Sequence, residues 1–91
     1  MAIQCIHFVV SGRVQGVYYR ASTQEQAQYL DLVGWVSNLD DGRVEGVACG
    51  EEVELQQFKA WLHDGPLHAK VSHVVFTDLP VQDFDDFEVR Y

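Results

Sequence analysis

The spacing of apolar residues changes from a period of two to a helical period and back along this chain, and this limits its fold more than any other feature. Residues 3–11 alternate apolar and less apolar side chains, as a strand with two distinct faces does. Residues 21–30 contain no Gly or Pro, and Thr23, Ala27 and Leu30 fall on one side at helical spacing. The chain therefore begins with a strand followed by a helix.

The remaining segments continue this pattern. A strand is expected over 34–38 and its partner over 43–49, because the Asp41-Gly42 pair between two apolar runs is a strong hairpin signal. Two glutamates at 51 and 52 suit a helix N-terminus, and Gly65-Pro66 ends the helix after about His63. The apolar stripe expected on that helix consists of Val53, Leu55, Phe58 and Leu62. Residues 70–77 and 87–91 are predicted to be strands.

The predicted order is β-α-β-β-α-β with a short terminal strand. This order predicts an α+β, ferredoxin-like sandwich in which two helices cover one face of an antiparallel sheet. At 91 residues, 47% of them apolar, the chain is expected to form a single domain over residues 1–91.

The segment from Gly12 to Arg20 joins the first strand to the first helix and is the best candidate for chemistry. Successive backbone N–H groups in such a loop, opening onto a helix N-terminus, form a partly positive concavity that suits a phosphate. Gly16 allows close approach, and Arg20 adds a planar charged fork for two phosphoryl oxygens. On spacing alone, an ordinary glycine-containing turn with two solvated arginines is the favoured explanation of the segment, because a loop with two glycines is a weak signal.

A family resemblance carries the interpretation further. Residues 10–20, VSGRVQGVYYR, resemble the first acylphosphatase signature, and residues 34–50, GWVSNLDDGRVEGVACG, resemble the second. The two motifs occur in the expected order and, with the predicted elements around them, extend the likeness over nearly the whole chain.

The resemblance implies hydrolysis of the carboxyl-phosphate bond in small acyl phosphates, without a metal or another cofactor. Arg20 would bind the phosphate, and Asn38 would hold the attacking water. The backbone amides of the loop would complete the phosphate cradle, and these belong to Gln15, Gly16, Val17, Tyr18 and Tyr19.

The chain departs from the family pattern at three positions. Tyr19 stands where Phe is usual and needs a partner for its hydroxyl if it is buried. Ser37 replaces a residue that is often larger and basic, and Asp31 stands where Gly commonly ends the helix, which predicts mild strain. The role of Arg13 stays open between lining the anion pocket and pairing with an acidic neighbour.

The charge balance restricts the partners. Six Lys and Arg stand against 14 Asp and Glu, so the net charge is −8, which disfavours binding to nucleic acid or to an anionic membrane. The N-terminal residues lack a basic leader and a cleavage site. We expect a cytoplasmic monomer whose partners are a small acyl phosphate and inorganic phosphate.

The two cysteines allow two interpretations. The predicted topology brings Cys5 and Cys49 to adjacent ends of neighbouring antiparallel strands, so a disulfide can form. A reducing cytoplasm favours two buried thiols instead.

Two other functions are compatible with the predicted fold. One is a non-catalytic module that binds phosphate in the same cradle, although such a module does not need Asn38 to position water. The other is an RNA-binding domain of similar topology, which the net charge opposes.

Overall fold

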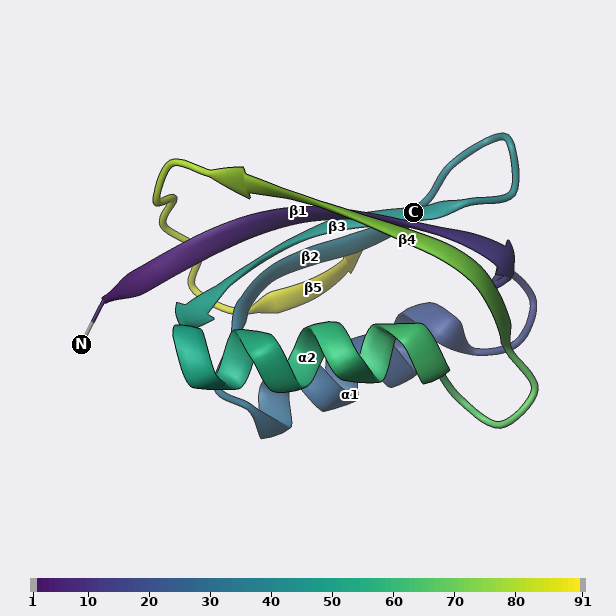
Figure 1. Cartoon of the computed structure of the whole chain (residues 1–91), viewed down its shortest axis with the longest axis horizontal. Coiled ribbons are helices and arrows are strands. Elements are labelled where there is room, and N and C mark those ends of the chain that lie inside the picture. The colour runs from purple at the N-terminus through teal and green to yellow at the C-terminus, as the bar shows by residue number, and fades with distance from the viewer. Residues whose placement is uncertain (1, 91) are drawn as a thin grey trace.

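A computed structural model describes residues 2–90 and contains the predicted order of elements (Figure 1). The elements are β1 (Ile3–Arg13), α1 (Tyr19–Tyr29), β2 (Val33–Asn38), β3 (Val44–Glu51), α2 (Glu52–Asp64), β4 (Lys70–Leu79) and β5 (Phe87–Arg90). Within the described residues, neither helix is long and apolar enough to cross a membrane.

The five strands form one sheet in the order β4-β1-β3-β2-β5, with both helices on one face (Figure 1). Strand β1 pairs antiparallel with β3 and β4, and β2 pairs antiparallel with β3. The predicted ferredoxin-like sandwich with an additional terminal strand is confirmed, and that strand, β5, runs parallel to β2, so the sheet is mixed. The connection after β4 crosses from one edge of the sheet to the other, and the chain then runs in the direction of β2.

Helix α1 packs against the sheet through the predicted side. Tyr19, Thr23 and Ala27 are its buried residues, and Leu30 follows them into the core. The Thr23 hydroxyl donates to the carbonyl of Tyr19 at 2.7 Å, which satisfies the one buried polar side chain of the described core.

Helix α2 buries Leu55, Phe58 and Leu62 as predicted, but Val53 is 64% exposed. At about 100° of rotation per residue, Val53 lies on the opposite side of the helix from Leu55, Phe58 and Leu62, so it faces away from the sheet. Phe58 makes an edge contact with Phe8 of β1 at a centroid distance of 5.6 Å. The contact between Phe8 and Phe58 therefore packs α2 directly against β1.

The opposite face of the sheet carries a smaller apolar cluster around Cys5, Val47 and Cys49. Cys5 is the direct cross-strand partner of Cys49, with a Cα–Cα distance of 4.1 Å, and the structure joins their sulfurs in a disulfide. The bond ties the start of β1 to the end of β3, at the end of the sheet away from the loop that follows β1.

The segment between β1 and α1 is shorter than predicted. Strand β1 extends to Arg13 instead of ending at Ser11, and α1 begins at Tyr19 instead of Ala21, so the loop proper is residues 14–18. The strand continues because its pairing with β4 resumes at Gly12 and Arg13 after a register shift between Ser11 and Gly12. Gly12 has φ +123°, and a Cβ there would lie 2.2 Å from the Lys70 carbonyl oxygen, so only glycine fits.

Candidate active site

The loop of residues 14–18 has a backbone suited to holding an anion. Gly16 has φ +74° and Tyr18 has φ +61°, whereas Gln15 before Gly16 and Val17 between the two do not have positive φ. Alternation of right-handed and left-handed residues turns successive N–H groups toward a common centre. Tyr18 accepts this strained conformation although it is not glycine.

The N–H groups of this loop are available to a ligand. Among the hydrogen bonds that join residues 2–90, none uses the backbone N–H of residues 15–18 as its donor. Helix α1 then begins at Tyr19 without a side-chain cap and without an acidic residue in its first turn. The loop and the helix N-terminus therefore present several unsatisfied donors and a partial positive charge side by side.

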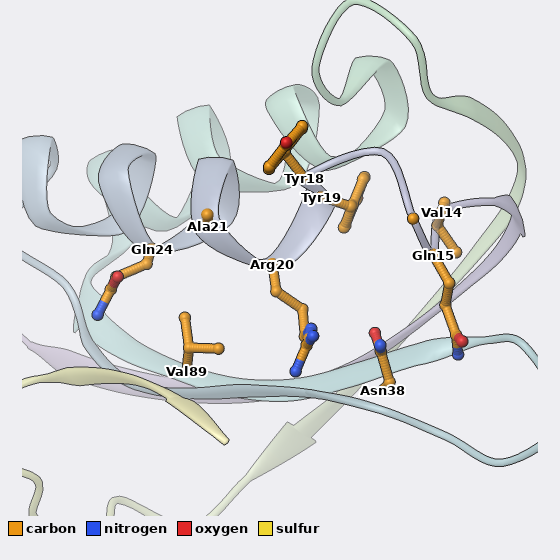
Figure 2. A pocket seen from close by; sticks show the side chains of 10 residues that line it. Val14, Gln15, Tyr18, Tyr19, Arg20, Ala21, Gln24, Asn38 and Val89 are labelled. Atoms are coloured by element: carbon orange, nitrogen blue, oxygen red, sulfur yellow. The ribbon is translucent and has the colours of Figure 1, made fainter. Parts of the chain in front are cut away.

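A pocket of about 710 Å³ opens under this loop (Figure 2). Its lining consists of Val14, Gln15, Gly16, Tyr18, Tyr19, Arg20, Ala21, Gln24, Asn38 and Val89. Figure 2 shows Arg20 reaching from α1, and Asn38 rising from the end of β2, into the same space. The two residues that the motifs single out thus meet across one cavity, although eighteen positions of sequence separate them.

The side-chain oxygen of Asn38 has no partner of its own. Asn38 Oδ1 is buried and accepts no hydrogen bond from any described residue. Buried acceptors are normally satisfied, because an unpaired one costs about 1–3 kcal/mol. An acceptor held in this way at the wall of a pocket is suited to a donor supplied by a bound molecule, such as water.

The guanidinium of Arg20 is held at the edge of the sheet. Its NH1 nitrogen donates to the carbonyl of Arg90, at the end of β5, at 3.1 Å. The Arg90 guanidinium lies over the ring of Trp35, 4.8 Å from the centroid, on the other face of the sheet. Strand β5 therefore contributes to the site through its backbone, which no motif in the sequence indicated.

A second unpredicted feature is the side chain of Gln15. Its Nε2 donates to the carbonyl of Leu39 at 2.8 Å and to that of Arg43 at 2.9 Å. Leu39 and Arg43 flank the turn of the β2–β3 hairpin, directly after Asn38. We call this pair of hydrogen bonds the Gln15 clamp, because it joins the loop of residues 14–18 to the hairpin that carries Asn38.

The hydroxyl of Tyr19 finds the partner that its burial requires. Tyr19 is 1% exposed, and its Oη donates to the carbonyl of Leu62 at 2.8 Å. Pro66 has no N–H, so the Leu62 carbonyl lacks the usual helical donor four residues later. Burial raises the pKa of the Tyr19 phenol, which keeps it a neutral donor. The side chain of Tyr19 therefore belongs to the core, and we expect only its backbone N–H to serve the phosphate site.

The other departures lie away from the reacting centre. Ser37 alternates with Asn38 along β2, and its hydroxyl contacts only the Asn38 carbonyl at 3.4 Å. Asp31 adopts φ +57°, as predicted for the residue that ends the first helix. Val17 does not line the main pocket but borders a second hollow beside it.

Arg13 also lies at this second hollow and not in the main pocket. No ion pair joins Arg13 to an acidic residue in the part of the chain described. Arg13 therefore neither lines the main pocket nor pairs with an acidic side chain among residues 2–90. The same residues contain no group of three His, Cys, Asp or Glu side chains that could hold a metal ion.

Comparison with known proteins gives a consistent result. The family model described as acylphosphatase matches residues 6–89. A protein of Marinobacter nauticus named acylphosphatase is 51% identical over 92 residues, covering all of both chains, and one of Pseudomonas aeruginosa is 51% identical over 99% of both. The structure of an acylphosphatase from Coxiella burnetii superimposes with a TM-score of 0.94 at 48% identity, covering 97% of this chain and 93% of the other.

Proposed function

Because the chain belongs to the acylphosphatase family, we propose that it is an enzyme that hydrolyses small acyl phosphates in the pocket under the loop of residues 14–18. The products are a carboxylate and inorganic phosphate. Within this reaction we assign phosphate binding to Arg20 and the loop amides of Gln15 to Tyr19, and positioning of the attacking water to Asn38.

The observation that carries the proposal is the buried, unpartnered Oδ1 of Asn38 in a cavity shared with Arg20. An amide cannot remove a proton usefully, but its carbonyl accepts a hydrogen bond from water and fixes the direction of the lone pair on oxygen. A module that only binds phosphate gains nothing from such an acceptor, because phosphate oxygens themselves accept hydrogen bonds.

The reaction needs little more than positioning and charge neutralisation. Water attacks phosphorus in line with the carboxylate leaving group, which departs with the electron pair of the P–O bond. The Arg20 guanidinium and the loop N–H groups stabilise the equatorial oxygens as charge spreads over them. One proton of the water passes to a phosphoryl oxygen, so the products are a carboxylate and dihydrogen phosphate. No metal enters this scheme.

The test is hydrolysis of a synthetic acyl phosphate, such as benzoyl phosphate, in the presence of excess EDTA. We expect full activity, competitive inhibition by inorganic phosphate, and loss of at least 100-fold in kcat/KM for Arg20→Ala and for Asn38→Ala. Lys59→Ala is the matched control, since it removes a positive charge on α2 that lies over the ring of Phe76 and not in the pocket. Each variant is checked for its fold by circular dichroism and urea unfolding.

Two results would overturn the proposal. Activity that EDTA abolishes would require a metal, and an Arg20→Ala protein with normal kcat/KM would remove the phosphate site from this pocket. Phosphate binding without any turnover would leave the non-catalytic module as the function.

A further inference from the structure

The second hollow beside the active site, of about 420 Å³, gathers basic side chains in a strongly acidic protein. It is lined by Arg13, Gly16, Val17, Tyr18, Leu67, His68, Ala69 and Lys70. Two of the six Lys and Arg residues of the chain, together with one of its four histidines, therefore meet in one small cavity while the net charge is −8. We call this cavity the basic hollow.

Arg13 and Lys70 are held together by the sheet. They are direct cross-strand partners of β1 and β4, beyond the register shift at Gly12, so their side chains leave the same face. Like charges at directly opposed positions destabilise a pair of strands. An anion between them would convert this repulsion into attraction.

No acidic side chain supplies that anion in the part of the chain described. Arg43 pairs with Asp41 and Arg90 with Glu88, whereas the side chains of Arg13 and Lys70 form no ion pair or hydrogen bond within residues 2–90. Arg20 donates to the Arg90 carbonyl and Lys59 lies over the ring of Phe76, so the two basic side chains without such a contact in this part of the chain are those that line the basic hollow.

The basic hollow adjoins the active site. Gly16 and Tyr18 line both cavities, so the loop of residues 14–18 forms their common border. At Gly16 the two cavities are separated only by backbone, because glycine has no side chain and no atom lies within 4 Å of the position that a Cβ would take. A substituent of a molecule bound under the loop can cross at this point.

From these observations we propose that the basic hollow binds a second anionic group on the acyl part of the substrate, through Arg13 and Lys70. This inference rests on the proposed function and narrows its substrate class to acyl phosphates whose acyl chain ends in a carboxylate or phosphate. The phosphoryl group stays with Arg20, and the acyl chain passes over Gly16 to the two cations.

The test compares substrates of equal size that differ in the charge of the tail. Benzoyl phosphates carrying a carboxylate in the meta or para position are matched with those carrying a neutral carboxamide there. We expect wild-type kcat/KM to favour the carboxylate at one of the two positions, although the net charge of the protein repels anions. Since exposed ion pairs are weak, Arg13→Gln and Lys70→Gln are each expected to lower the carboxylate-to-carboxamide ratio by about two- to fivefold. The double variant is expected to abolish the preference.

Lys59→Gln is the control, because it changes the net charge equally but lies outside the basic hollow. An equal fall of the carboxylate-to-carboxamide ratio in Lys59→Gln would overturn this inference, and so would a wild-type ratio of one or below at both ring positions. In either case, hydrolysis of unsubstituted benzoyl phosphate would still support the proposed function. Failure to hydrolyse benzoyl phosphate itself would overturn both. Unfolding midpoints establish that each variant is folded at the assay temperature.

Discussion

The Gln15 clamp offers the most informative perturbation of the site, because it joins the phosphate loop to the hairpin without touching the reacting atoms. In Gln15→Leu both hydrogen bonds are lost, and a typical one contributes about 0.5–1.5 kcal/mol net. Neither carbonyl is left without a partner, since Leu39 O still accepts from the Gly42 N–H at 3.2 Å and Arg43 O from the Leu39 N–H at 2.8 Å. The expected loss of unfolding free energy is therefore only about 1–2 kcal/mol.

The effect on catalysis follows from the same energy. The clamp is expected to hold Asn38 in position relative to the phosphate cradle. Its loss would then reduce transition-state stabilisation by up to about 1–2 kcal/mol, which lowers kcat by about five- to thirtyfold. KM is expected to change by less than a factor of three, because the loop amides and Arg20 remain. Gln15→Glu keeps the length of the side chain but replaces the donor by a carboxylate that repels both carbonyls, so its kcat is expected to fall further at neutral pH.

The assay is steady-state hydrolysis of benzoyl phosphate at a temperature well below the unfolding midpoint of every variant, combined with urea unfolding. Gln57→Leu on the exposed side of α2 is the matched control. A Gln15→Leu protein that loses stability but keeps kcat within a factor of two would refute the reasoning, because the clamp would then be structural only.

Three further predictions concern stability. The Cys5–Cys49 disulfide closes a sequence separation of 44, so its reduction is expected to lower the free energy of unfolding by up to about 4 kcal/mol. Urea titrations with and without dithiothreitol measure this loss, and the stability of a double Cys→Ala variant should not depend on the reductant. Tyr19→Phe leaves the Leu62 carbonyl unsatisfied, so we expect a loss of about 1–3 kcal/mol by the same titration, and an unchanged midpoint would contradict the hydrogen bond. Gly16→Ala meets no atom but forces an L-residue into φ +74°, which should cost about 1–2 kcal/mol and weaken inhibition by phosphate.

Local patterns in the sequence were sufficient for the order of elements and for the buried side of α1. They failed where a distant segment decides the outcome. The parallel pairing of β5 depends on the path of the connection after β4. The exposed Val53 is a different case, because helical spacing itself places it opposite Leu55, Phe58 and Leu62. The extension of β1 depends on the approach of Lys70 to Gly12, which no local pattern records.

The same distinction applies to the site. Arg20 and Asn38 follow from two motifs, because each motif places its residue at the end of an element that the fold brings to a common edge. The clamp from Gln15 and the placement of Arg13 at the basic hollow depend on carbonyls and strands that are distant in the sequence. A spacing pattern in the sequence does not contain these relations, so only the three-dimensional arrangement reveals them.

The position of β1 in the middle of the sheet has a consequence for the growing chain on the ribosome. Both neighbours of this strand, β3 and β4, follow it in the sequence, and Cys5 pairs with Leu79 of β4. Its backbone therefore has one uncovered edge until β4 has left the ribosome, and such non-local pairing is slow to form. Completion of the sheet, and with it of the phosphate loop that β1 leads into, thus depends on the synthesis of β4.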